Sequence, residues 1–202
     1  MGGTAAPRGP FPYFVAVLTT NGTYRAGALL NSEYILTQDE YEGEKIAFGL
    51  NEGQSFEDLF SSSNPKTRNV VDNVYVPSSN LLMMRVSPPI DFDWSVRPIK
   101  FTDCSGASEP IVDEDLVYFG LGDNGLQNYS DTLQMKCGQV VEPTDSDCTD
   151  DVAQFSVSNH FCVQSEACSG DWGGPLATME DGEFVLVGII YLAYRAACDS
   201  KL

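Results

Sequence analysis

The sequence predicts an all-β protein. Glycine and proline are frequent, with 18 and 11 of 202 residues, and they supply the turns that short strands need. Apolar residues fall in short alternating runs, and no stretch keeps a 3.6-residue period long enough to predict a helix. A hydrophobic fraction of 43% is enough for a substantial core, in one compact unit or two small ones. The best strand candidates are residues 14–18, 112–119 and 184–191.

The charge balance excludes several classes of partner. The chain carries 29 acidic and 11 basic residues, for a formal net charge of −18. Such a surface repels nucleic acids and anionic membranes, and it suits either a basic protein partner or simple solubility. No run approaches the roughly 20 apolar residues that span a bilayer. We therefore expect neither a nucleic-acid partner nor a membrane segment.

The six cysteines and the sequons indicate an extracellular protein. An even number of cysteines favours disulfides in an oxidising compartment. There is no C-x-x-C spacing and only one histidine, so we expect no metal site and no cofactor. Asn21 and Asn128 each begin an N-x-S/T sequon and are candidate glycosylation sites. Together these features predict a secreted protein.

Three segments carry the most specific signal. Residues 168–176 read CSGDWGGPL, residues 25–41 read RAGALLNSEYILTQDEY, and residues 79–86 read SNLLMMRV. They resemble the nucleophile, histidine and aspartate motifs of the chymotrypsin/trypsin-like serine protease family. Shorter matches follow in the family's order, at Pro12-Tyr13, Val96–Ile99, Gly120–Gly122, Phe161-Cys162 and Gly188–Ile190.

The resemblance implies two antiparallel Greek-key β-barrels packed against each other. The first barrel would take residues 1–86, a linker residues 87–100, and the second barrel residues 101–202. The family's last strand and C-terminal helix would be missing after Leu202. We therefore expect either that the sequence is a fragment or that a rearranged segment or a partner covers the open edge.

All three positions of the catalytic triad are replaced in this alignment. Trp172 falls on the serine, Glu40 on the histidine and Asn80 on the aspartate. An indole cannot attack a carbonyl, and an asparagine has no charge to stabilise an imidazolium. The single histidine, His160, leads into a structural cysteine, and by the resemblance we expect it far from the catalytic cleft.

The resemblance also assigns the neighbouring positions. Asp171 matches the buried aspartate that receives a new N-terminal amine in the family. Arg25 and Tyr41 replace a family disulfide, and we expect them to stack in its place. The specificity pocket is expected to be partly filled, with Trp172 either packed into the vacated site or serving as a plug or partner anchor. The residues expected to line the specificity pocket are Glu166, Ala167, Tyr191 and Ala193.

Disulfide pairing follows from the resemblance for four cysteines. The family pattern implies Cys148–Cys162 and Cys168–Cys198. Cys104 and Cys137 remain as a third pair by elimination, with no motif behind that pairing.

These observations predict a catalytically inactive serine protease homologue that acts by protein binding. It would be a cofactor, scaffold or decoy, for example in a protease cascade or in host defence. One alternative is a structural, storage or bulk secretory protein that retains the protease scaffold. A second is an enzyme that uses a carboxylate pair, with Glu40 beside Asp39 or Asp171.

Overall fold

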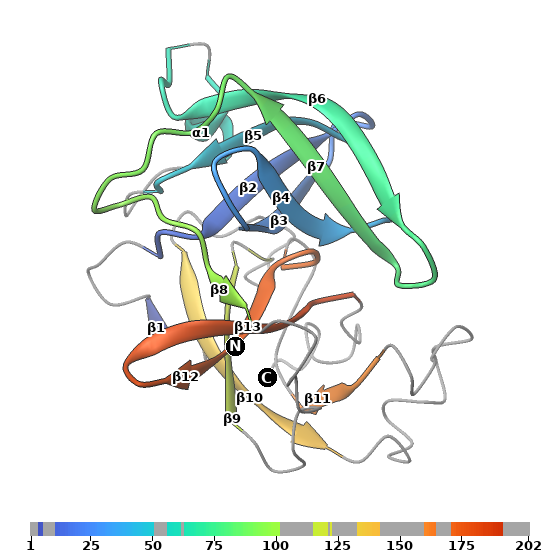
Figure 1. Ribbon diagram of the computed structural model, residues 1–202, viewed down its shortest axis with the longest axis vertical. Coiled ribbons are helices and arrows are strands. Elements are labelled where there is room, and N and C mark those ends of the chain that lie inside the picture. The colour runs from blue at the N-terminus through green and yellow to red at the C-terminus, as the bar shows by residue number, and fades with distance from the viewer. Residues whose placement is uncertain are drawn as a thin grey trace, which may run out of the picture.

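The computed structural model describes residues 4–5, 11–50, 56–61, 63–101, 115–120, 122, 133–141, 160–164 and 171–191. This part of the chain is all-β apart from the four-residue helix α1 (Phe56–Leu59), which confirms the predicted fold class. The strands form two bodies, one above the other in Figure 1.

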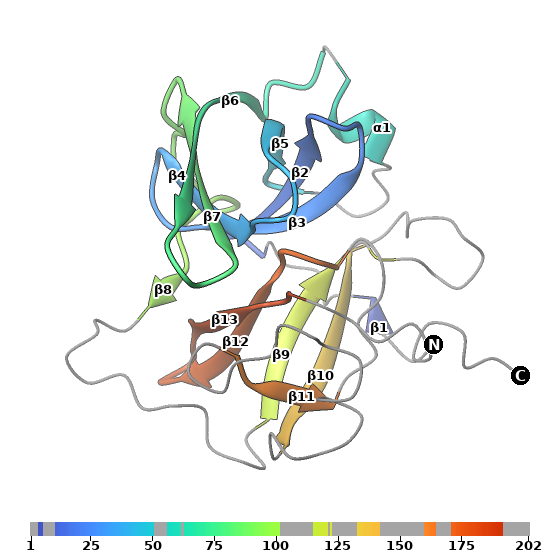
Figure 2. The same ribbon diagram turned by 90° about the vertical axis from the view of Figure 1, so that its right-hand side faces the viewer.

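The first body is a closed antiparallel barrel of six strands, and Figure 2 shows these strands arranged in a ring. Its side chains alternate as the pleat requires: Leu82, Met84 and Val86 are buried, and the residues between them are partly exposed. Around the barrel the order is β2 (Phe14–Thr19), β3 (Tyr24–Leu29), β4 (Tyr34–Gln38), β7 (Leu81–Ser87), β6 (Thr67–Val76) and β5 (Gly43–Phe48).

The second body is a sheet in which all described pairings are antiparallel except that of β8 with β13. The predicted strands at residues 14–18, 112–119 and 184–191 correspond to β2, β9 and β13. The predicted division into a first barrel at residues 1–86, a linker at 87–100 and a second barrel at 101–202 stays a prediction. The sheet order is β1 (Thr4–Ala5), β10 (Gln134–Val141), β9 (Asp115–Gly120), β12 (Pro175–Glu180), β13 (Glu183–Ile189) and β8 (Lys100–Phe101), and β11 (Cys162–Gln164) pairs with β10.

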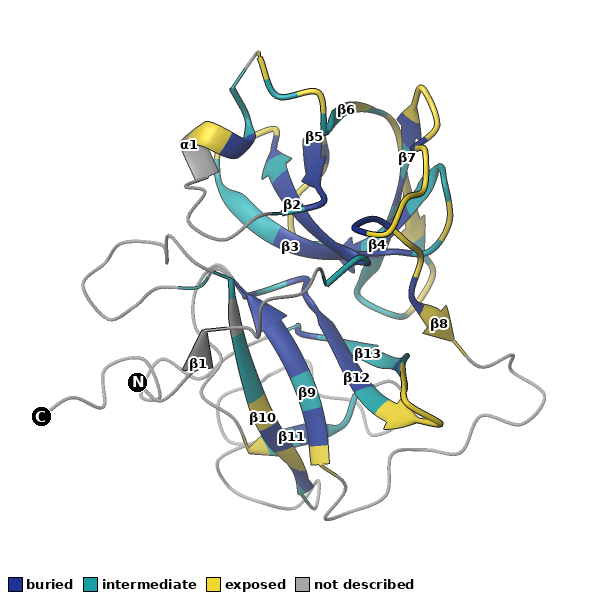
Figure 3. Cartoon of the chain, turned by 90° about the vertical axis from the view of Figure 1, so that its left-hand side faces the viewer, coloured by how far each residue is buried: buried dark blue, intermediate teal, exposed yellow. Residues whose placement is uncertain are grey.

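One buried apolar cluster spans the two bodies, and a second, smaller cluster lies within the second body. Phe119 of β9 and Ala177 of β12 belong to the same buried cluster as the barrel residues, and Figure 3 shows the buried strands meeting between the halves. The Phe119 ring lies 3.9 Å from that of Phe11 and 6.0 Å from that of Tyr13, centroid to centroid. Burial strongly raises the pKa of Tyr13, so this phenol stays neutral. The shared core fixes how the turns of one body face those of the other.

The segment that joins β7 to β8 is held by a polar turn at Asp93. The Ser95 backbone N–H and hydroxyl both donate to Asp93 Oδ1, at 2.6 and 2.7 Å, and Lys66 Nζ donates to Ser95 Oγ at 2.9 Å. The two hydrogen bonds from Ser95 lower the pKa of Asp93, and Lys66 adds to the effect. The ionised form of Asp93 therefore stabilises this turn.

Asp93 is expected to contribute to acid sensitivity. Its native pKa lies below the ordinary value of 3.8, so its contribution is present above that pH and is lost as the pH falls through the native pKa. Asp93→Asn should therefore show a smaller loss of stability than the wild type when denaturant midpoints at about pH 6 are compared with those below about pH 4. Asp91→Asn is the matched control, because no described residue donates a hydrogen bond to Asp91. An equal acid response in the wild type and Asp93→Asn would contradict the assignment.

Candidate functional site

The three predicted triad positions lie in turns at the boundary between the two bodies. Glu40 is in the turn between β4 and β5, Asn80 in the turn between β6 and β7, and Trp172 in the turn before β12. Backbone hydrogen bonds tie these turns to the scaffold. Asp39 N–H donates to the Asn80 carbonyl at 3.1 Å, and Ala26 N–H of β3 donates to the Trp172 carbonyl at 2.9 Å.

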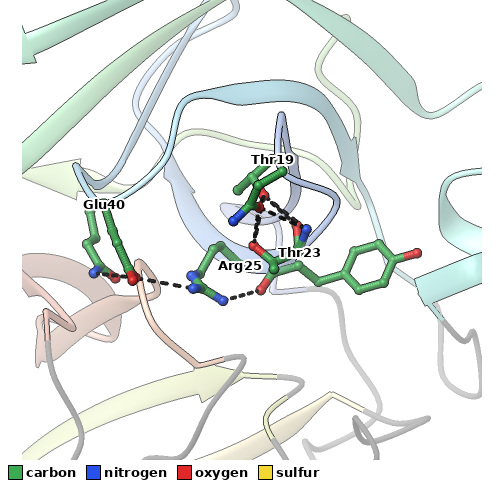
Figure 4. A network of polar contacts seen from close by, with 7 residues as sticks. Thr19, Thr23, Arg25 and Glu40 are labelled. Atoms are coloured by element: carbon green, nitrogen blue, oxygen red, sulfur yellow. Dashed lines mark hydrogen bonds and ion pairs between the residues drawn. The ribbon is translucent and has the colours of Figure 1, made fainter.

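Arg25 of β3 links two of these positions. Its Nη2 lies 3.2 Å from Glu40 Oε2, and Figure 4 shows the guanidinium directed at that carboxylate. Its Cζ lies 4.9 Å from the centroid of the Trp172 ring and 5.6 Å from that of Tyr41. The expected stacking of Arg25 with Tyr41 is confirmed, and the guanidinium also contacts Trp172.

Charge and stacking hold this group together. The Arg25 side chain is 13% exposed and the Glu40 side chain 37%, so the ion pair is sheltered mainly on the arginine side. Gln38 Nε2 is placed to donate to the same Glu40 oxygen at 3.2 Å. Among the described residues, the buried Nε of Arg25 and Nε1 of Trp172 have no hydrogen-bond partner. The contact between Arg25 and the indole is therefore one of cation and ring face.

The lone histidine also lies at this boundary, so the expectation that it lies far from the site is wrong. His160 Nε2 lies 3.1 Å from Asn80 Oδ1, and its ring stacks on that of Tyr191 with centroids 5.4 Å apart. A carbonyl oxygen only accepts, so His160 donates this hydrogen bond. Asn80 Nδ2 is 3.4 Å from the Tyr191 hydroxyl. The asparagine at the aspartate position thus contacts a histidine from the other half of the chain.

Tyr191, one of the expected pocket-lining residues, faces acidic residues. Burial raises its pKa, and the negative charges of Asp39 and Glu40 raise it further. The phenol is therefore neutral near pH 7, and its hydroxyl is available for the contact with Asn80.

Asp171 is buried beside two glycines. It is 3% exposed, and its Oδ1 accepts the Gly122 N–H at 2.8 Å. A Cβ atom at Gly120 or Gly122 would collide with this carboxylate, which explains why both positions are glycine. A Cβ atom at Gly173, next to Trp172, would likewise collide with Thr37 and Ala26 of the barrel.

The described cysteines correct one predicted disulfide. Cys137 of β10 is exposed and free, so the pairing of Cys104 with Cys137 is wrong. That pairing rests on elimination alone and has no motif behind it. Cys162 is disulfide-bonded to a residue outside the described part, and its pairing with Cys148 stays a prediction.

Several predicted positions lie outside the described residues, namely Glu166, Ala167, Ala193, Cys104, Cys148, Cys168, Cys198 and Asn128. Within the part that the structure describes, no three His, Cys, Asp or Glu side chains are grouped to hold a metal ion. Nor does that part contain a helix of the length and hydropathy needed to cross a membrane.

Two features of the site were not anticipated from the sequence. The ion pair joins residues 15 positions apart, and the contact of His160 with Asn80 joins residues 80 positions apart. The signal available for the ion pair is a pair of opposite charges: Arg25 matches one cysteine of the family disulfide, and Glu40 is the neighbour of Tyr41, which matches the other. Nothing local to His160 indicated its contact.

Comparison with known proteins agrees with this fold and arrangement of motifs. The family model for trypsin matches residues 1–201, and the chain therefore belongs to the trypsin-like serine protease family. It is 30% identical to trypsin iota of Drosophila melanogaster over 128 residues, which cover 60% of this chain and 47% of that protein. It is 22% identical to kallikrein 1-related peptidase b21 of Mus musculus over 196 residues, which cover 87% of this chain and 74% of that protein. The match thus spans less than half of trypsin iota.

Proposed function

We propose that this chain is a secreted, non-catalytic serine protease homologue that acts by binding a protein partner, as a cofactor, scaffold or decoy. The observation that carries the proposal is the state of Trp172. It occupies the nucleophile position by sequence, and its ring lies 4.9 Å from the Arg25 guanidinium. The lone pair of the indole nitrogen belongs to the aromatic π system, so Trp172 cannot attack a peptide carbonyl.

The groups around Trp172 also support the proposal that the chain is non-catalytic. Peptide hydrolysis in this family needs a base that takes a proton from the nucleophile and a charged group that orients the base. Glu40 is instead paired with Arg25, whose Nη2 lies 3.2 Å from the carboxylate oxygen Oε2. His160 donates to Asn80, a neutral side chain that has no charge to stabilise an imidazolium. At the positions of the family's base and aspartate, Glu40 and Asn80 thus make contacts that we expect to stabilise the fold and not to transfer protons.

The charge of the chain favours a basic partner. A net charge of −18 on 202 residues gives an acidic surface whose long-range field attracts cationic proteins and speeds their association. Binding of this kind weakens as salt rises, because exposed charges separated by more than about 10 Å are screened at 0.1 M ionic strength.

We expect no peptidase activity from the purified protein. The test incubates it with a mixed peptide library and with a fluorophosphonate probe, which labels the activated serine of working enzymes; active trypsin is the positive control. No label and no new peptides are expected. Cleavage that co-purifies with the wild type but is lost in Glu40→Gln or Trp172→Ala would overturn the proposal and would favour carboxylate chemistry.

Native mass spectrometry of the protein from its natural source addresses the binding role. A complex with a second polypeptide that dissociates at high salt is the expected result. Homo-oligomers at high abundance, with no second polypeptide, would instead support the structural or storage alternative.

A further inference from the structure

The turn between β2 and β3 presents a complete N-x-T sequon to solvent. Asn21 and Gly22 form its exposed tip, and Thr23 directly precedes β3. Gly22 has a φ of +80°, and no atom lies within 4 Å of where its Cβ would be, so the space beside the tip is open. We propose that Asn21 is an acceptor of an N-linked glycan.

The hydrogen bonds of the turn orient the Asn21 carboxamide. Its Oδ1 accepts from the Thr23 N–H at 3.1 Å, from the Thr23 hydroxyl at 2.8 Å and from the Thr19 hydroxyl, in the network of Figure 4. All three donors converge on the oxygen. The other end of the planar amide, Nδ2, donates to no described residue. Nδ2, the atom to which a glycan would be attached, thus takes no part in the hydrogen bonds to Oδ1 that hold the turn.

The covalent step leaves this network intact. In N-glycosylation, the amide nitrogen bonds to C1 of the first sugar of a lipid-diphosphate oligosaccharide, the C1–O bond breaks, and the lipid diphosphate leaves with the electron pair. Nδ2 loses one proton, which passes to the leaving diphosphate or to solvent, and Oδ1 keeps its lone pairs. The three hydrogen bonds to Oδ1 can therefore coexist with the glycan in the folded protein.

The folded barrel can accommodate a glycan at Asn21. The Thr19 backbone N–H donates to the Thr23 carbonyl at 3.0 Å and the Gly22 N–H donates to the Thr19 carbonyl at 2.9 Å, so the turn is closed below the tip. Asn21 and Gly22 are exposed, whereas the strands on either side contribute to the core. A sugar at Asn21 would extend from the barrel without displacing a core side chain.

This proposal rests on the proposed secretion, because the donor and its transferase belong to the secretory pathway. The full chain is expressed in eukaryotic cells behind a secretory leader, and cell-associated and exported protein are both analysed. Release of N-glycans by an amidase that converts the acceptor asparagine to aspartate is followed by intact-mass measurement and peptide mapping. Conversion at position 21 is the expected result.

Matched variants separate the sequon from its surroundings. Asn21→Gln and Thr23→Ala should each abolish conversion at position 21, whereas Thr23→Ser, which keeps a hydroxyl, should retain it. Asn128→Gln should leave conversion at position 21 unchanged. An unconverted Asn21 in protein that has entered the secretory pathway, or conversion that persists in Thr23→Ala, would overturn the proposal. The peptidase assay does not depend on the glycan, so failure of the proposed function would be recognised separately.

Discussion

Replacement of Gly173 by alanine is expected to lower the free energy of unfolding by about 3 kcal/mol or more. Gly173 has a φ of +82°, where a Cβ atom adds about 1–2 kcal/mol of strain. That Cβ would also collide with the hydroxyl of Thr37 and the carbonyl oxygen of Ala26, both in the barrel. Overpacking of this kind typically costs a further 1–3 kcal/mol. Denaturant unfolding followed by tryptophan fluorescence measures the change.

Gly182 supplies the control for this substitution. Its φ is +81°, yet no atom lies within 4 Å of its Cβ position. Gly182→Ala should therefore cost only the backbone strain, about 1–2 kcal/mol. If Gly173→Ala and Gly182→Ala lower the free energy of unfolding equally, the close approach of the two bodies at Gly173 does not contribute to stability.

Removal of the Glu40 side chain is expected to cost about 1–2 kcal/mol, a Tm decrease of about 2–8 °C for a domain of this size. Glu40→Ala leaves the Arg25 guanidinium, whose side chain is 13% exposed, without its carboxylate. Loss of one partner from a fully buried pair costs about 3–5 kcal/mol. The carboxylate here is 37% exposed, so water reaches the pair and reduces the effect. Calorimetry at low and high salt measures it.

A double-mutant cycle isolates the ion pair from packing. Arg25→Met removes the charge but keeps an unbranched stem between Trp172 and Tyr41. In that background Glu40→Ala should be nearly neutral, which gives a coupling energy of about 1 kcal/mol or more. If Glu40→Ala costs the same with and without the guanidinium, its effect comes from the turn between β4 and β5 and not from the pair.

The fold could be predicted because its signals are local. Alternation along β2 and β13 and the frequent glycines and prolines follow from the geometry of strands and turns, which the printed sequence displays directly. The motif around Trp172 also retains the backbone requirement at Gly173, where the left-handed conformation favours glycine. Family spacing then aligned the three substituted positions, and the structure places all three in turns at the same boundary.

The contacts of the site could not be predicted because they join residues that are far apart in the chain. Whether Arg25 would meet Trp172 depends on how closely β3 approaches the second body. The contact of His160 with Asn80 joins residues 80 positions apart, and no local pattern specifies it. The free Cys137 shows the same limit, since counting cysteines gives an even number but no distances.

The Arg25 contacts have a consequence for restoring the family motif in this chain. A histidine at position 40 would put a ring that can become cationic beside a sheltered guanidinium, and a serine at position 172 would take away the aromatic face on which Arg25 rests. Each single substitution toward the family motif is therefore expected to give a less stable protein unless position 25 changes first. Restoring that motif in this chain would thus require an ordered set of substitutions that begins at Arg25.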